Sequence, residues 1–167
     1  ENAAIVSLAW DFKQLPLAEF TWVEGLAIRE LAFTGTPETP PRLGPRLSLL
    51  GQLYCQDLRL NELNLSNVPA LTKLSCSHNQ LTELDLSNVP ALTKLNCFNN
   101  GLTELNLSNV PALTELVCWH NQLTKLDLSN VPALTELNCS SNRLTELNLS
   151  NIPALTDLEC EKNQLTE

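Results

Sequence analysis

Six cysteines have the widest chemical range of the residues in this sequence, because thiolates bind zinc, form disulfides and act as nucleophiles. Zinc sites and disulfide frameworks favour even counts and close spacing. Here each cysteine lies 21 residues from the next; the six are Cys55, Cys76, Cys97, Cys118, Cys139 and Cys160. Such a constant spacing marks one position of a repeat, and a free cysteine packs as a small hydrophobe. We therefore predict a structural ladder of buried thiols, with no disulfide and no metal.

Histidines and serines are the other candidates for catalysis. His78 and His120 lie two repeats apart, about 10 Å at the strand spacing of a sheet, with no acidic or thiol partner at the spacing of a shared metal site. The serines recur at scaffold positions, and they form no recognisable Ser-His-Asp arrangement. The five glycines are scattered singly, unlike a glycine-rich phosphate loop. These patterns predict neither an enzyme nor a cofactor.

Charge and hydropathy narrow the class of partner. The 167 residues carry 19 acidic and 10 basic side chains, a net charge of -9. This acidity argues against binding to the phosphates of nucleic acid or of an anionic membrane. A hydrophobic content of 43% suits one globular domain, and no apolar run is long enough to cross a bilayer. The sequence begins at Glu1 without the features of a signal peptide, which leaves the compartment open.

One 21-residue unit repeats from about residue 50 to the end of the sequence. Its first full copy, from Leu71 to Ala91, reads LTKLSCSHNQLTELDLSNVPA. Leu74 and Cys76 alternate with polar residues, and so do Leu84 and Leu86, which is the two-residue period of a half-buried strand. A proline recurs where a connecting helix would run: Pro69, Pro90, Pro111, Pro132 and Pro153. We predict a mainly β solenoid of parallel strands, with two short strands per coil and little helix.

Asparagine follows the first predicted strand of each full repeat, at Asn79, Asn100, Asn121, Asn142 and Asn163. The backbone turns inside the stack there, which leaves amides and carbonyls without partners, and a carboxamide offers both donors and an acceptor. Five copies of one residue suit a scaffold better than a catalyst. We therefore assign this column, like the cysteine column, to the structural ladder, while the repeated leucines stack into one core.

The pattern LxxLxCxxNxLxxLxL resembles the 21-residue bacterial leucine-rich repeat of the IRREKO class. The resemblance covers residues 50–167, although the first copy has Leu58 where asparagine belongs, which puts the hydrogen bonding of that coil in question. Repeats of this class imply a protein-binding role, as the recognition arm of bacterial surface or host-directed proteins. They favour a secreted, surface or host-delivered location.

Residues 1–49 read as degenerate N-terminal coils or a cap. Leu17, Phe20, Trp22 and Gly25 fit the first half of the repeat, and Ile28, Leu31 and Phe33 fit the second. The alternation of Val6, Leu8, Trp10 and Phe12 favours an outer strand over a capping helix, with aromatic side chains filling the space that leucine and cysteine fill later. Segment 34–45, with four prolines, reads as an inserted extended loop.

The last repeat stops at Glu167, part-way through the unit and with no divergent cap. An open solenoid end exposes strand edges and core leucines. Three interpretations stay open: the natural chain continues, the edge pairs with another subunit in self-association, or the sequence is a trimmed or engineered piece.

Differences between the repeats gather on the outward positions of the first strand, on a sheet that we expect to be concave. Equivalent residues of successive coils lie about 4.8 Å apart, which places Phe98 beside Trp119. Large aromatic side chains dominate interface energies. We predict a partner-binding patch centred on this pair; around it lie Val117, His120, His78, Lys73 and Lys94. Alternatively, the two rings only stabilise the sheet, by ~0.2 to 1 kcal/mol.

These observations favour a protein-binding module. A recognition arm of a larger bacterial enzyme or toxin is an alternative, and so is an idealised repeat scaffold without a partner. A glycan is a further candidate ligand, because aromatic platforms also stack on sugar rings.

Overall fold

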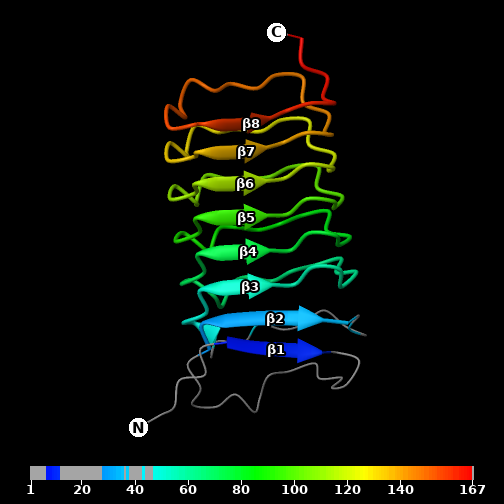
Figure 1. Ribbon diagram of the computed structural model, residues 1–167, viewed down its shortest axis with the longest axis vertical. Coiled ribbons are helices and arrows are strands. Elements are labelled where there is room, and N and C mark those ends of the chain that lie inside the picture. Colours follow the sequence, from blue (N-terminus) through cyan, green and yellow to red (C-terminus); the bar gives the residue numbers. More distant parts are fainter. Residues whose placement is uncertain (1–6, 12–27, 36, 38–42, 44–46, 167) are drawn as a thin grey trace.

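The computed structural model describes residues 7–11, 28–35, 37, 43 and 47–166. One parallel sheet contains eight strands in chain order: β1 (Ser7–Asp11), β2 (Glu30–Thr34), β3 (Gln52–Tyr54), β4 (Lys73–Ser75), β5 (Lys94–Asn96), β6 (Glu115–Val117), β7 (Glu136–Asn138) and β8 (Asp157–Glu159). Figure 1 shows them stacked along the long axis of the molecule. The described residues contain no α-helix. The predicted helix-poor solenoid is confirmed.

The 21-residue period sets the register of the sheet. Lys73 pairs with Lys94, and Lys94 pairs with Glu115, so that each strand meets the same three positions of the next coil. Alternation then sends Leu74 and Cys76 into the interior, where they are 1% and 0% exposed. Because every coil repeats this pattern, the buried side chains form one continuous core along the stack.

The second half of the coil differs from the prediction of a second strand. Leu84 and Leu86 are buried and Glu83 and Asp85 are exposed, as the alternation predicts. Among the described residues, however, the backbone from Thr82 to Leu86 makes no coil-to-coil hydrogen bond, so each coil has one strand. Side chains take up nearby backbone groups instead: the Leu81 amide donates to Asn100 Oδ1 and the Ser87 amide to Asp85 Oδ1.

The predicted N-terminal strand is present as β1, with Trp10 buried. Trp10 pairs with Phe33, which occupies the place of cysteine in the later coils. The predicted alignment of Leu31 and Phe33 is wrong, because both belong to the sheet-forming half of their coil: Leu31 pairs with Leu53. Both halves of the repeat alternate in the same way, so the pattern alone does not distinguish them. The proposed match of residues 17–25 lies outside the described residues.

The sheet register gives the length of the coil that contains the predicted insertion at residues 34–45. Glu30 pairs with Gln52, a step of 22 residues against 21 between Gln52 and Lys73. The coil that contains the proline-rich segment is therefore one residue longer than the regular repeat. Most of this segment lies outside the described residues.

The part of the chain that the structure describes has no helix long and apolar enough to cross a bilayer.

Candidate functional site

The asparagine column links each coil to the one before it. Asn121 Nδ2 donates to the carbonyls of Cys118 in its own coil (3.0 Å) and Cys97 in the preceding coil (3.1 Å). Its Oδ1 accepts from the amide of Leu102 (3.1 Å). One buried carboxamide thus satisfies three backbone groups in two coils.

The coil that has Leu58 in place of asparagine keeps these hydrogen bonds. Asn79 of the following coil accepts from the amides of Leu58 (3.1 Å) and Leu60 (3.0 Å) and donates to the carbonyl of Cys55 (2.8 Å). Each asparagine bonds to the coil before its own and to the cysteine carbonyl of its own coil, so Leu58 removes one donor and leaves the Cys55 carbonyl with the bond from Asn79. A row of threonines adds a second link: the Thr93 hydroxyl, for example, donates to the carbonyl of Thr72 (3.0 Å).

The cysteine column consists of free thiols, buried from Cys55 to Cys139 and half-buried at Cys160. Burial raises the pKa of Cys76 from 9.0 to about 12, and burial together with the neighbouring Cys160 raises the pKa of Cys139 to about 12. Such thiols stay protonated at neutral pH, whereas nucleophilic attack and metal binding need the thiolate. Among the described residues, no group of three His, Cys, Asp or Glu side chains is arranged to hold a metal ion.

The outward side chains of the strands form three columns, which together we call the sheet face. The first column begins each repeat strand: Gln52, Lys73, Lys94, Glu115, Glu136 and Asp157. The second column lies two residues on: Tyr54, Ser75, Asn96, Val117, Asn138 and Glu159. The third column follows the strands, where backbone hydrogen bonds continue the ladder: Gln56, Ser77, Phe98, Trp119, Ser140 and Glu161. Every residue of the predicted patch lies on the sheet face or directly after it.

Phe98 and Trp119 stack face to face in the third column, with ring centroids 4.5 Å apart and an angle of 8° between the planes. His78 meets Phe98 in a T-shaped contact at 4.7 Å, and His120 meets Trp119 in the same manner at 6.0 Å. These four residues form one aromatic cluster across three coils. The predicted neighbourhood of Phe98 and Trp119 is therefore present.

The backbone fixes where the two histidines stand. His78 and His120 have φ angles of 53° and 55°, in the left-handed region, and Asn99 has the same conformation at 52°. Here the chain leaves the strand and turns into the asparagine ladder. Asn99 Nδ2 also lies within hydrogen-bond distance of His78 Nδ1 (2.5 Å). The turn that the scaffold requires therefore holds the histidines beside the rings.

The basic part of the predicted patch is already paired within the chain. Lys94 Nζ lies 2.6 Å from Glu115 Oε2. The hydrogen bond to Glu115, together with its charge, raises the pKa of the Lys94 ammonium above its usual range. Lys73 Nζ lies 5.3 Å from the centre of the Tyr54 ring, a cation–π contact. Glu115, which the comparison of the repeats places on the same sheet but outside the predicted patch, and Tyr54, which it missed, are thus parts of this surface. Tyr54 belongs to the partial first repeat, which a comparison of full copies leaves out.

Charge is divided along the sheet face. Its lysines, Lys73 and Lys94, lie on β4 and β5, whereas the first column is acidic from β6 to β8. Glu159 and Glu161 extend the acidic part into the second and third columns. The aromatic cluster lies between the two parts.

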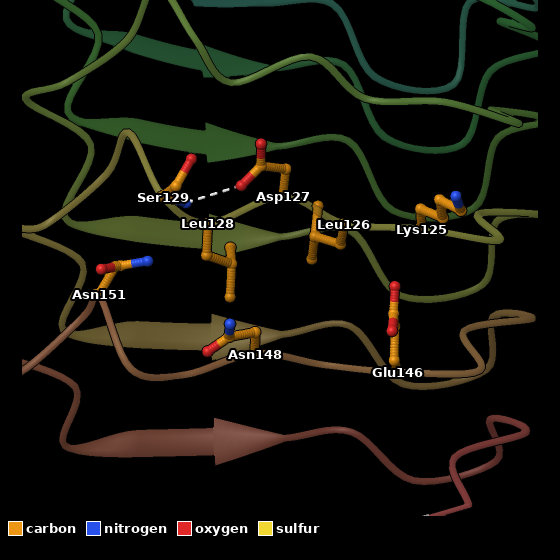
Figure 2. A pocket seen from close by; sticks show the side chains of 8 residues that line it. All are labelled: Lys125, Leu126, Asp127, Leu128, Ser129, Glu146, Asn148 and Asn151. Atoms are coloured by element: carbon orange, nitrogen blue, oxygen red, sulfur yellow. Dashed lines mark hydrogen bonds between the residues drawn. The ribbon is translucent and has the colours of Figure 1, made fainter.

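A pocket of about 230 Å³ lies outside the sheet face, between the second halves of two successive coils (Figure 2). Leu126 and Leu128 line it together with polar side chains, among them Lys125 and Glu146. The Ser129 amide donates to Asp127 Oδ1 (2.9 Å), and this bond and one with the Ser129 hydroxyl hold the pKa of Asp127 below its usual range. Equivalent turns recur at Asp85 and Asn106, which marks the polar wall as part of the scaffold.

The sheet order ends at β8, where Leu149 and Leu158 are both 37% exposed. Self-association through this edge stays a prediction.

Comparison with protein families gives a match to the family described as leucine-rich repeats in two copies, over residues 69–109 and 111–151. Comparison with curated proteins gives no match.

Several solved structures share the fold. The functional domain of InlJ from Listeria monocytogenes, which includes a cysteine ladder, is 30% identical with a TM-score of 0.75, over 90% of this chain and 38% of that one. YopM from Yersinia enterocolitica is 29% identical with a TM-score of 0.62, over 85% and 28%. The internalin InlF from Listeria monocytogenes is 24% identical with a TM-score of 0.77, over 89% and 46%, and shows the fold alone. The chain spans less than half of each. Its fold is that of a leucine-rich-repeat solenoid, similar in structure to bacterial proteins of this kind.

Proposed function

We propose that the chain is a protein-binding module that receives its partner on the sheet face, with Phe98 and Trp119 at the centre of the contact. The observation that carries the proposal is the stack itself. Two large rings lie half-buried in a column where the neighbouring coils have Ser77 and Ser140. Aromatic side chains of this kind supply much of the binding energy at protein interfaces.

The alternative role, stabilisation of the sheet alone, accounts less well for the pattern. Each coil is already held by its leucines and by the asparagine and threonine bonds, and coils with serine in the third column share the same register. A stacked pair contributes about 0.5 to 1.5 kcal/mol beyond its buried area. That gain does not explain why the rings sit on the variable surface and are joined there by His78 and His120.

We also propose that the repeats belong to the 21-residue IRREKO-like class and that the protein acts as a secreted, surface or host-delivered bacterial protein. The similarity to the InlJ domain, whose cysteine ladder has a counterpart in the buried thiol column here, supports the first statement. The bacterial origin of the similar structures supports the second. Fractionation of the source cells, with an antibody to the chain, tests the location.

The first test is affinity capture with the wild-type chain and a Phe98→Ala, Trp119→Ala variant, from extracts of the source organism and of candidate host cells. We expect a protein that the wild type retains and the variant loses by tenfold or more, because two anchors at about 2 kcal/mol each are removed. A Lys125→Ala, Glu146→Ala variant is the matched control, since both side chains are exposed on the other half of the coil.

Circular dichroism and urea unfolding must show that all three proteins fold. Equal capture by the aromatic variant and the wild type would contradict the proposal, and so would loss of capture in the control variant alone. A glycan array checks the other ligand class: binding there that depends on Trp119, without any captured protein, would replace protein binding by sugar binding.

A further inference from the structure

The aromatic stack ends at Trp119 on the side of β7. One face of the indole contacts Phe98, and successive coils are about 4.8 Å apart, so the other face looks toward the next residue of the third column. That residue is Ser140, whose side chain is a single hydroxymethyl group. A ring-sized position in the column is therefore occupied by a small side chain.

The surroundings of His78 show that a ring fits at the position that corresponds to Ser140. His78 makes its T-shaped contact with Phe98, the residue 20 positions on, in the following coil. The residue 20 positions after His120 is Ser140, and the backbone relation is the same, because the amides of His78 and His120 donate to the carbonyls of Phe98 and Ser140. In the place where His78 has the Phe98 ring of the following coil, His120 has Ser140.

Carboxylates surround this position on the side away from Trp119. Glu161 is the next residue of the third column, about one strand spacing beyond Ser140. Glu159 lies beside it in the second column, and its Oε2 accepts a hydrogen bond from Asn138 Nδ2 (2.8 Å). The Asn138 Oδ1 in turn accepts from the Ser140 amide (3.1 Å), which fixes the orientation of this group. One side of the position is thus aromatic and the other is acidic.

We propose that the position over Ser140 binds the guanidinium group of an arginine on the partner protein, stacked on Trp119 and paired with Glu161 and Glu159. This inference rests on the proposed function and names the chemistry of the partner: an exposed arginine in a basic segment that faces β7 and β8. The acidic first column on these strands, Glu136 and Asp157, adds attraction for such a segment.

Planarity favours arginine over the other candidates. A guanidinium stacks flat on an indole and presents several N–H donors in its plane, whereas a lysine ammonium is a strongly hydrated point charge. A neutral ring would fill the position but would leave the carboxylate of Glu161 beside an apolar group and partly desolvated. The sheet already pairs a cation with an aromatic face at its other end, where Lys73 lies over Tyr54.

A peptide titration tests the inference without knowledge of the partner. The probe is an acetylated, amidated Gly-Arg-Gly-Arg-Gly peptide, and the signal is the indole N–H of Trp119 in the ¹⁵N-labelled chain at about 150 mM salt. Loss of one signal in Trp119→Phe assigns it, and the indole of Trp10, which is 4% exposed, serves as an internal reference. We expect a saturable shift of the Trp119 signal, with binding roughly threefold or more tighter than to the matching lysine peptide.

Two pairs of variants locate the binding. Ser140→Phe fills the position and should weaken arginine-peptide binding about tenfold, whereas Ser140→Ala should leave it unchanged, since cation–π contact requires the open indole face. Glu161→Gln should weaken binding about threefold or more, whereas Glu104→Gln, the same charge change on the other half of the coil, should have little effect.

No saturable shift, equal affinity for the lysine peptide, or unchanged binding in Ser140→Phe and Glu161→Gln would each overturn the inference. The proposed function fails separately. If a captured protein depends on Phe98 and Trp119 but binds Ser140→Phe and Glu161→Gln as well as it binds the wild type, the module stands and the arginine site is wrong.

Discussion

The cysteine column and the third column of the sheet face are one residue apart in the sequence, yet they differ in almost every respect. Cys97 and Cys118 are buried in a column that is cysteine in six coils. The residues that follow them, Phe98 and Trp119, belong to a column that also contains glutamine, serine and glutamate. Because a strand sends successive side chains to opposite faces, one position of the repeat is fixed by packing while its neighbour is free to vary.

The interior column is fixed because each cysteine from Cys76 to Cys139 lies between two copies of itself. A change in one coil alters the fit to the coils on both sides, as in any stack where contacts are made between neighbours. A residue on the sheet face has solvent on its outer side and carries no such constraint. The scaffold and the binding surface can therefore be separated experimentally, and the predictions below do so in order of expected effect.

The largest expected effect is a loss of stability in alkaline solution, caused by the buried cysteine column. The pKa of Cys76 and Cys139 is about 12 in the folded chain against an ordinary 9.0, so between these values the folded state keeps protons that the unfolded state loses. The contribution of each buried thiol to the free energy of unfolding is therefore fully present below pH 9. It is lost above pH 9, with a slope that approaches about 1.4 kcal/mol per pH unit for each thiol. Because several buried thiols contribute in this way, we expect the chain to unfold between pH 9 and about pH 11.

Urea unfolding under reductant at pH 8, 9 and 10 measures this fall. The variant Cys76→Ala should lower the fall in unfolding free energy between pH 9 and 10 by about 1 kcal/mol, because the unfolded thiol is half deprotonated at pH 9 and mostly deprotonated at pH 10. The two proteins share every other ionisable group, so the comparison isolates the thiol. Identical slopes would show that this thiol does not govern the alkaline transition.

The next effect concerns the asparagine ladder. Asn121→Ala removes a carboxamide that bonds to Cys97, Cys118 and Leu102, and it leaves the buried amide of Leu102 without this partner. The two cysteine carbonyls keep one donor each, from the asparagines of the neighbouring coils. We expect a loss of about 2 to 4 kcal/mol in unfolding free energy. Asn109→Ala, at an exposed turn, should change stability by less than about 0.5 kcal/mol. Equal effects of the two substitutions in urea unfolding would contradict the structural role of the ladder.

The repeat made most of this architecture predictable. A spacing of 21 residues fixes the register, and the register alone places Phe98 against Trp119 before any coordinates are known. The single strand per coil was not predictable in this way, because alternation reports an extended chain and not its hydrogen bonds. The place of Leu31 and Phe33 in the sheet-forming half of their coil was not predictable for the same reason, because both halves of the repeat alternate in the same way. The left-handed backbone of His78 and His120 gives only a weak compositional signal. Four coils have aspartate, histidine or asparagine at that position, types that are enriched at positive φ, but the other two have serine and lysine.

The smallest expected effect concerns two asparagines of the sheet face. Asn96 and Asn138 occupy the same position of the second column, but the buried Oδ1 of Asn96 has no hydrogen-bond partner among the described residues. Asn138 accepts from the Ser140 amide and donates to Glu159. The difference follows from the next coil, which offers Val117 to Asn96 and Glu159 to Asn138.

Replacing both by valine should therefore have opposite consequences. Asn96→Val removes an unsatisfied buried acceptor and places a β-branched residue in a strand, so we expect a gain of about 1 kcal/mol. Asn138→Val breaks two hydrogen bonds, and we expect a loss of about 1 kcal/mol. Urea midpoints of the two variants measure the contrast at the same place in the repeat. A shift of both midpoints in one direction would mean that strand propensity, and not the neighbouring side chain, decides which residue this column tolerates.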